Sequence, residues 1–418
     1  MTCESCVEKD RIISELKKRI ELLERRNKDM EEQLKEISSY VWKPKRHTTT
    51  PQKLGPPAGH EPHTRPVPDT VHRTVSLSLK RCPECSRALS KPVRMRERYV
   101  EDIRPPEPLN TRYLIPVYYC RHCKEQVSPK PVEVIPKCRF GIKVMLLTSY
   151  LRYGMLLPFN KIASLLEASY GLHVTEGCLV DALTRFADHL GPEFEKIKTE
   201  IRESPYVHKD TTSWPINGKN RVLWAFVSGE HTLLLVRDTK AQGIVYQTLG
   251  TDYGGVSITD GAKEYQDLGW KQQTCWVHLL RSTRKLETVE GKALHGKVKE
   301  LYRLAKSRKA GKSVLQAYVD DLLSIPFNER KCIVFQKRME QNRDKLFTFM
   351  YRKGVKSDNN AAERGLRPSV VMRKITGGNR SAKGARNHEV IMSVMGTWRK
   401  QGMDFLSHGE EYMRNHVR

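Results

Sequence analysis

The stretch Ser357-Asp358-Asn359-Asn360-Ala361-Ala362-Glu363-Arg364-Gly365-Leu366-Arg367-Pro368 decides how the rest of the sequence is interpreted. Its run of Ser, Asp and Asn predicts a helix start, because these side chains accept hydrogen bonds from the free N–H groups of a first turn. The spacing i, i+3, i+4 and i+7 then puts an acid and two cations on one helix face, formed by Asn360, Glu363, Arg364 and Arg367. Such a face suits phosphate groups beside a carboxylate. The spacing from Asn360 to Glu363 is also that of a capping box, in which the acid only binds a backbone N–H.

Two further acids follow runs of strand character. Asp210 ends the run Tyr206-Val207-His208, and Asp260 ends Val256-Ser257-Ile258-Thr259. Carboxylates are the oxygen ligands that Mg²⁺ and Mn²⁺ prefer. Three acids on separate elements therefore predict one divalent-metal site.

The composition indicates a protein that binds nucleic acid. At 418 residues the chain is long enough for about two to four domains. Its 74 Lys and Arg against 48 Asp and Glu give a formal net charge of +26, which predicts a polyanionic partner such as DNA. No stretch stays apolar for the roughly 18 residues of a membrane span, and the N-terminus is charged, so we expect a cytoplasmic protein without membrane contact.

The N-terminal segment has the period of a coiled coil. Apolar residues recur at alternating steps of three and four from Ile13 to Val41. Asn27 falls at an a position, where a buried Asn favours parallel pairing in register, and oppositely charged e and g positions would face each other in a pair. The segment predicts a homodimer; a helix packed along its own chain is the alternative. The role of Cys3 and Cys6, which precede it, is left open.

Two C-x-x-C pairs predict a zinc-binding domain. They follow a linker rich in Pro, His, Thr and Arg from Lys43 to about Thr74, which cannot form a core. Strand-like runs at Val93–Val100 and Tyr113–Tyr119 separate the pairs. In a reducing compartment such pairs favour metal over disulfides, and two hairpin knuckles would hold a structural zinc, as in a zinc ribbon. The expected zinc ligands are Cys82, Cys85, Cys120 and Cys123. The surrounding basic side chains suggest contact with DNA or, alternatively, a solvated basic face.

Helical spacing follows from Gly141 to about Ile201. Two of these helices flank the turn Tyr170-Gly171-Leu172-His173-Val174-Thr175, in which Thr175 is suited to cap the next helix. The pair predicts either a helix-turn-helix that reads DNA or a plain helical packing domain.

A mixed sheet is expected next. Strand-like runs at Tyr206–Asp210, Val222–Ser228 and Thr232–Arg237 are separated by the turn signals Asn217-Gly218 and Gly229-Glu230. Helical stretches and further strands alternate after them. This order predicts an α/β core with acids at strand ends.

Beyond these patterns, the chain resembles a DDE transposase of the insertion-sequence sixty-six family. The resemblance covers most of the chain and rests on four motifs, which are Asp210-Thr211-Thr212, Thr259-Asp260-Gly261 with Tyr265, Cys275-Trp276-Val277-His278 with Arg281, and Asp358-Asn359-Asn360-Ala361-Ala362-Glu363-Arg364 with Arg367-Pro368. It implies a ribonuclease-H-like core whose catalytic, Mg²⁺- or Mn²⁺-binding acids are Asp210, Asp260 and Glu363. The charged stretch at about 279–351 resembles the α-helical insertion that some of these enzymes carry. Where many relatives have aromatic residues, this chain has Lys374-Ile375-Thr376-Gly377-Gly378.

The resemblance implies a multidomain α/β protein. The expected parts are a coiled coil at 1–42, a basic linker at 43–75, a zinc-binding domain at 76–138, a helix-turn-helix-like domain at 139–202, the catalytic core at 203–400 and a C-terminal tail at 401–418. The implied function is that of a transposase of a bacterial or archaeal insertion sequence, which binds terminal inverted repeats, cleaves them and joins them to target DNA, with accessory proteins as further partners. A catalytically inactive DNA-binding relic or repressor is the alternative, and a structure-selective nuclease is a third; the presence of all three acids favours the transposase.

Cations around and after the last acid are expected to contact DNA. These are Arg364, Arg367, Lys374, Arg380, Lys383 and Arg386, and surface salt bridges are the alternative for the first two. We expect Arg373–Asn387 to be a flexible basic strip along the DNA backbone, followed by a core-closing helix at Val390–Trp398. Cys275 and His278 have metal-like spacing, but packing, or a hydrogen bond that orients the site, is the favoured interpretation.

Overall fold

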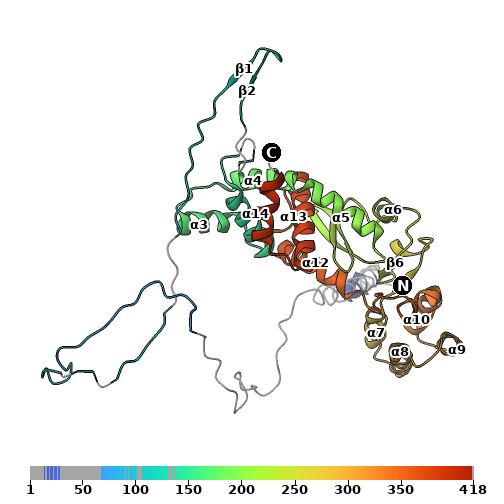
Figure 1. Cartoon of the computed structure of the whole chain (residues 1–418). Helices are drawn as coiled ribbons and strands as arrows, with labels where there is room; N and C mark the ends of the chain where they lie inside the picture. Colours follow the sequence, from blue (N-terminus) through green and yellow to red (C-terminus); the bar gives the residue numbers. More distant parts are fainter. Residues whose placement is uncertain are drawn as a thin grey trace, which may run out of the picture. The chain divides into compact units, whose positions relative to one another are not determined.

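A computed structural model describes residues 14, 17, 19–21, 23–25, 27–28, 67–89, 91–92, 94–100, 106–129, 134–135 and 138–416. The chain forms two compact units, Met1–Asp102 and Ile103–Arg418. The second unit has a mixed α/β fold, as predicted (Figure 1).

Most of the predicted coiled coil, and the linker as far as residue 66, lie outside the described residues. The described residues between 14 and 28 are helical. Ile20 and Leu23, which belong to the apolar heptad positions, are 54% and 53% exposed. The helix therefore presents part of an apolar seam to solvent.

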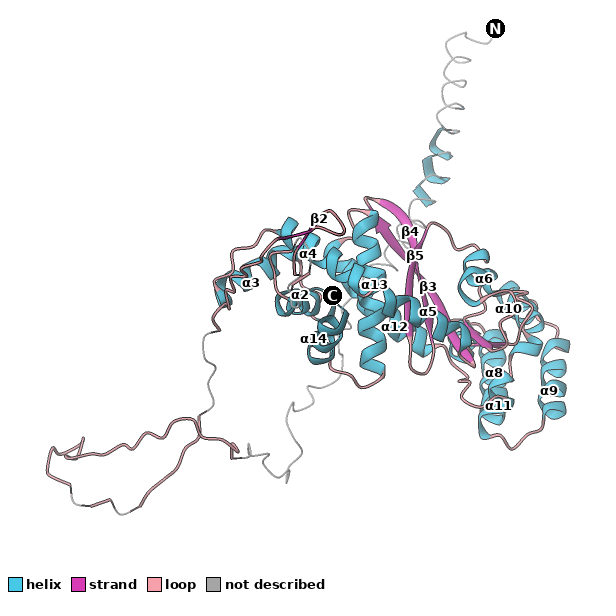
Figure 2. Cartoon of the chain, turned by 45° about the horizontal axis from the view of Figure 1, so that its top comes forward, coloured by secondary structure: helices cyan, strands magenta, loops and turns pink. Residues whose placement is uncertain are grey.

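A mixed sheet of five strands lies at the centre of the second unit (Figure 2). Its order is β5-β4-β3-β6-β7, with β3 at Tyr206–Ile216, β4 at Lys219–Val227, β5 at Thr232–Arg237, β6 at Val256–Thr259 and β7 at Gln272–Thr274. The first three strands pair antiparallel, whereas β6 is parallel to β3 and β7 is parallel to β6. The strand β4 is buried from Val222 onward, as expected for a strand covered on both faces.

The hairpin between β3 and β4 corrects one prediction. Asn217 and Gly218 both have positive φ, 48° and 74°, which is the primed turn that matches strand twist. The turn extends the pairing of β3 to Ile216. The prediction that a strand ends at Asp210 was therefore wrong: the acid lies inside β3.

Helices on the sheet share one core with it. They are α2 (Ile142–Ser149) with the π-turn η1 (Tyr150–Gly154), α4 (Glu176–His189), α5 (Gly191–Glu203), α12 (Asn360–Thr376), α13 (Ala382–Lys400) and α14 (Phe405–His416). Before α4, the helix α3 (Phe159–Tyr170) ends at Gly171, whose φ is +63°. The hydroxyl of Thr175 accepts a hydrogen bond from the N–H of Cys178, so the predicted cap is confirmed.

The helix α13 protects the edge strand β5. The hydroxyl of Ser393 accepts a hydrogen bond from the N–H of Leu234 at 2.8 Å, and the hydroxyl of Thr397 accepts one from Thr232 at 3.0 Å. An open edge would otherwise offer these groups to another chain. The predicted core-closing helix at Val390–Trp398 is thus confirmed as part of α13, with polar side chains that complete the sheet.

The expected insertion is helical, and its helices share a second core with β6. It contains α7 (Trp276–Arg284), α8 (Val289–Ser307), α9 (Lys312–Ser324), α10 (Arg330–Gln341) and α11 (Thr348–Tyr351). The helices α8, α9 and α10 cluster together in both views (Figures 1 and 2). We call α7 to α10 the helical lobe.

The remaining elements are short. They are α6 (Gly243–Leu249), the single turns η2 (Lys263–Tyr265) and η3 (Arg343–Lys345), and a hairpin of β1 (Tyr118–Cys120) and β2 (Glu125–Val127). The described residues 94–100 contain no strand, so the predicted strand at Val93–Val100 was wrong for them, and the predicted strand at Tyr113–Tyr119 begins only at Tyr118. The described residues of these runs before Tyr118 have strand-forming side chains but no neighbouring strand with which to pair. None of the described helices is long and apolar enough to cross a bilayer.

Candidate active site

The sheet topology brings the first two acids to neighbouring positions. In the parallel pair of β3 and β6, His208 lies opposite Ile258. Asp210 and Asp260 each lie two residues beyond that pair, on the same side of their strands. Glu363 comes from the first turn of α12, which packs against β3. The three acids thus lie on or next to three separate elements, and the metal site that they would form stays a prediction.

The three carboxylates repel one another. Burial, opposed by a hydrogen bond from the N–H of Thr211 and reinforced by the charges of Asp260 and Glu363, raises the pKa of Asp210 to about 6. One oxygen of Asp210 accepts this bond at 2.8 Å, and one oxygen of Asp260 accepts the N–H of Ala262 at 3.0 Å. The second oxygen of each acid has no hydrogen bond from the residues that the structure describes.

Asn359 fixes the start of α12 beside Asp210. It is fully buried, and its amide donates to the carbonyl of Lys209 at 2.8 Å while its Oδ1 lies 3.2 Å from Nδ1 of His208. Its own N–H donates to Sγ of Cys275 at 3.1 Å. The sequence pattern identified Asn359 only as a capping residue, but its side chain ties the helix to the strand that carries the first acid. The cap itself comes from Asp358, whose Oδ1 accepts the N–H of Asn360 at 3.1 Å.

Cys275 and His278 have different roles at this point. Cys275 is buried just before α7, and not on the predicted strand, because β7 already ends at Thr274. Its Sγ accepts the N–H of Asn359, and the side chain is fully buried, which agrees with the packing or hydrogen-bonding role expected for it. Nε2 of His278 lies 3.5 Å from Oε1 of Glu363, and burial lowers the pKa of this histidine. Arg281, one turn later, lies 4.0 Å from the same oxygen.

Arg338 links the helical lobe to the second acid. This residue of α10 donates to the backbone carbonyl of Asp260 at 2.7 Å and to the hydroxyl of Ser282 at 3.3 Å. The next residue, Gly261, has φ +80°, and a Cβ there would lie 3.8 Å from the Arg338 guanidinium and in contact with Thr274. No motif in the sequence singled out Arg338, because it lies 78 residues from its partner.

The donor set fits a divalent cation. Oε1 of Glu363 is buried and accepts no hydrogen bond from the described residues, although His278 and Arg281 lie 3.5 and 4.0 Å from it. Three carboxylates near one another need positive charge, and all three supply hard oxygen ligands. The acids would therefore hold Mg²⁺ or Mn²⁺, the metals that suit such ligands.

A second group of acids lies in the helical lobe. The ligand atoms of Glu290, Glu329 and Cys332 lie within 4.8 Å of one another, closer than the three acids at the sheet. Glu290 accepts the N–H groups of Asn328 and Glu329 just before α10. This geometry is that of an acid at a helix N-terminus, where the helix dipole favours a negative charge.

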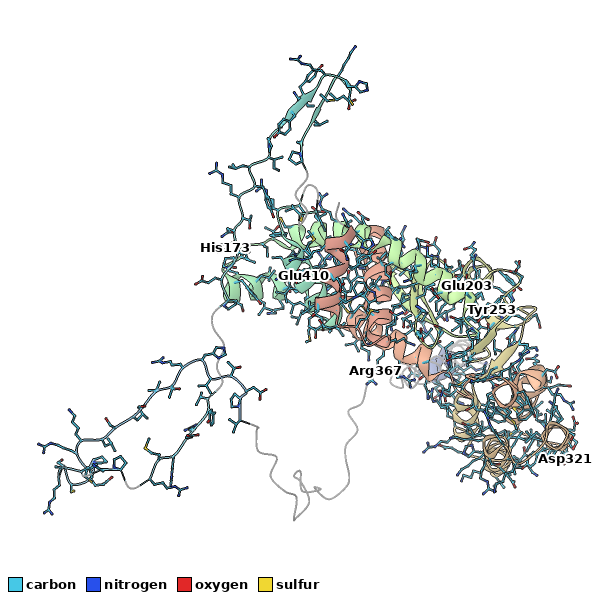
Figure 3. All side chains as sticks on the ribbon, in the orientation of Figure 1. His173, Glu203, Tyr253, Asp321, Arg367 and Glu410 are labelled. Carbon is cyan, nitrogen blue, oxygen red and sulfur yellow. The ribbon has the colours of Figure 1, made fainter. Side chains whose placement is uncertain are left out.

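The predicted DNA-contacting cations are all exposed. Arg367 lies on the outside of α12 (Figure 3). Lys383 lies 3.5 Å from Asp181, and Arg386 lies 3.3 Å from Glu389, so these two already have acidic partners. The expected flexible strip at Arg373–Asn387 was wrong: α12 continues to Thr376 and α13 begins at Ala382, with only a short turn between them.

That turn is fixed to β3. The indole N–H of Trp214 donates to Oδ1 of Asn379 at 2.7 Å, and the N–H of Asn379 donates to the carbonyl of Pro215 at 3.0 Å. Gly378 has φ +106°, and a Cβ there would lie 2.3 Å from the Pro215 carbonyl oxygen. Only glycine fits this approach, which explains the glycine at position 378.

Each cysteine pair forms a knuckle in its own unit. In the first unit, the N–H of Ser86 donates to the carbonyl of Cys82 at 2.8 Å, closing a turn. In the second unit, the N–H of Cys123 donates to Sγ of Cys120 at 3.5 Å. Backbone N–H groups lower the pKa of Cys82 and of Cys120, which favours the thiolate form that binds zinc.

The fold and the carboxylate site define an α/β protein with acids poised for divalent metal. The model of the Transposase IS66 family matches residues 137–387, which include the whole sheet, the helical lobe and all three acids. The chain therefore belongs to the IS66 family of DDE transposases. As a class, transposases cleave DNA and transfer its strands, and DDE transposases use divalent metal ions. No curated protein matches the chain.

Proposed function

We propose that this chain is an active transposase in which Asp210, Asp260 and Glu363 hold two divalent ions. The observation that carries the proposal is the convergence of the three acids from β3, the end of β6 and α12, close enough for two of them to raise the pKa of the third. Two divalent ions about 3.5–4 Å apart are the arrangement with which such carboxylate sites catalyse displacement at phosphorus.

The sheet supports the ribonuclease-H-like core that the resemblance implied. Three antiparallel strands followed by two parallel ones, in the order β5-β4-β3-β6-β7, put the first acid on the central strand and the second on its parallel neighbour. The final acid comes after the helical lobe, on a helix that packs against β3.

The residues around the acids orient them for reaction on DNA ends. The family resemblance implies that Asp210 would contribute to both ion sites and that Asp260 and Glu363 would each complete one of them. When bound, the ions would activate a water or a 3′-hydroxyl and stabilise the leaving 3′-oxygen. Asn359 and Arg338 hold the elements that carry the acids. The exposed Arg364 and Arg367 extend along α12 from Glu363 and are placed to bind flanking phosphates.

We propose two further roles from the sequence pattern. The thiolates of Cys82, Cys85, Cys120 and Cys123 would hold a structural zinc, since N–H groups already favour the thiolate form in each knuckle. The N-terminal helix would form a parallel homodimer, since its apolar positions Ile20 and Leu23 are exposed in a single chain.

Cleavage and strand transfer of labelled DNA carrying the element's own ends test the main proposal. The wild-type chain should generate 3′-hydroxyl ends and joined products with Mg²⁺ or Mn²⁺. Asp260→Asn should reduce both products to background, whereas Asp321→Asn, an exposed acid at the outer end of the helical lobe, should not (Figure 3).

The other outcomes separate the alternatives. Cleavage by Asp260→Asn at the wild-type rate would refute the assignment of the acids. Cutting without joining would favour a nuclease. Binding of the ends by all variants without any cutting would favour a DNA-binding relic or repressor.

A further inference from the structure

A groove of about 780 Å³ lies between α7 and α10 and begins at the active site. His278 lines its inner end, and Nε2 of this residue lies 3.5 Å from Oε1 of Glu363. The other lining residues are Arg281, Ser282, Lys285, Leu286, Arg330, Lys331 and Val334. The groove therefore adjoins the carboxylate site through His278.

Its lining is positively charged. Arg281 and Lys285 come from α7, Arg330 and Lys331 come from the first turn of α10, and no acid lines the groove. Arg281 faces Glu363, but Lys285, Arg330 and Lys331 form no ion pair with any residue that the structure describes. Unpaired cations that converge from two helices suit a polyanion.

The lining of the groove also contains two apolar side chains. Leu286 is half-buried, and Val334 is 58% exposed, one helical turn after Arg330. A row of cations around apolar side chains matches a nucleotide strand, whose phosphates alternate with sugars and bases. A small anion would be bound by the cations alone and would make no use of the apolar side chains.

We propose that this groove binds the DNA strand next to the scissile phosphate. The proposal rests on the proposed function, because it assumes that the acids beside His278 are the place where DNA is cut. From His278 to Lys285 the helix α7 advances by roughly 10 Å, which is about three steps of the DNA rise. The groove would thus hold nucleotides about two to five positions from the cut.

Photo-crosslinking locates the DNA. A benzophenone amino acid replaces Val334 in the full chain, and it replaces Val314 in the control. Both valines are 58% exposed and lie in the helical lobe, but Val314 does not line the groove. With labelled end DNA in EDTA, so that no cutting occurs, we expect a crosslink from position 334 about two to five nucleotides from the scissile phosphate. Position 314 should give at most a weak, unlocalised signal.

Charge removal gives a second readout. We compare Lys285→Gln/Arg330→Gln/Lys331→Gln with a matched triple variant, Lys297→Gln/Lys299→Gln/Lys312→Gln, whose lysines are exposed on the same lobe outside the groove. The plot of log binding constant against log salt concentration should become shallower by about 2 to 3 for the groove variant, since each phosphate contact contributes about 0.9. The control should change by less than about 1.

The outcomes distinguish this proposal from the proposed function. Equal salt slopes for the two triple variants, or equal crosslinking from both valine positions, would refute the groove as a DNA site even if the wild-type chain cuts DNA normally. Localised crosslinking and a reduced slope support the groove even if no cleavage is detected, because both experiments are made without metal.

Discussion

Replacing Asp210 by Asn should stabilise the metal-free protein at neutral pH. Burial, together with the charges of Asp260 and Glu363, raises the pKa of this acid from 3.8 to about 6. The folded state therefore holds the proton more tightly than the unfolded chain does. A pKa difference of about 2 corresponds to about 3 kcal/mol of folding free energy, which the ionised wild type lacks and the uncharged variant keeps.

The raised pKa of Asp210 determines how the stability of the wild type changes with pH. Below about pH 4 the acid is protonated in both states, so its ionisation does not affect stability. Between about pH 4 and pH 6 the unfolded chain ionises first, and the wild type loses stability as pH rises. Above about pH 6 the difference stays constant. Asp210→Asn should therefore gain about 1 kcal/mol over the wild type at pH 4.5 and about 3 kcal/mol at pH 7.5.

Urea unfolding in EDTA at these two pH values measures the effect. Asp321→Asn is the matched control, because it removes an exposed carboxylate and should change stability by no more than about 0.5 kcal/mol. Mg²⁺ at ten times its dissociation constant should stabilise the wild type by about 1.4 kcal/mol and Asp210→Asn by less. If Asp210→Asn is no more stable than the wild type in EDTA at pH 7.5, the electrostatic account of the site is wrong.

Three further predictions concern the supports of the site and the cysteines. Asn359→Ala removes two buried hydrogen bonds and should lower the free energy of unfolding by about 2 to 4 kcal/mol in urea. The control Asn360→Ala, whose side chain forms no hydrogen bond with described residues, should lower it by about 0.5 kcal/mol. Equal losses would contradict the role of Asn359. Gly378→Ala should lower the free energy of unfolding by about 3 kcal/mol or more, because the added Cβ would meet the Pro215 carbonyl. Gly377→Ala, with open space around it and φ +72°, should lower it by only about 1 to 2 kcal/mol. Urea unfolding measures both, and a smaller loss for Gly378→Ala than for Gly377→Ala would refute the packing argument. Elemental analysis should find about one zinc ion per wild-type chain. The zinc content should fall sharply in Cys85→Ser but not in Cys178→Ser, which changes an exposed cysteine outside the two pairs. Unchanged zinc in Cys85→Ser would exclude the predicted ligand set.

Local chemistry in the sequence was sufficient for much of the fold. The Asn217-Gly218 pair predicted its hairpin because few other residues tolerate two consecutive positive φ values. Thr175 predicted a helix start because its hydroxyl replaces a missing backbone partner. The three acids were proposed from local patterns of the same kind, and their role as a metal site stays a prediction.

Where prediction failed, the deciding partner was distant in the chain. Asp210 looked like the end of a strand, but pairing with β4 carries that strand six residues further, to Ile216. The glycine-rich segment after α12 looked flexible, but contacts with Trp214 and Pro215 hold it in a fixed turn.

By itself, the sequence determined the type of chemistry: three carboxylates, a basic chain and the family to which it belongs. Only the tertiary structure decided which side chains support the acids, because Asn359 meets Lys209 across 150 residues and Arg338 meets Asp260 across 78. Hydrogen bonds of this kind depend on how the helical lobe and α12 pack against the sheet. Sequence periodicity describes the faces of single elements, and it carries no information about which faces meet.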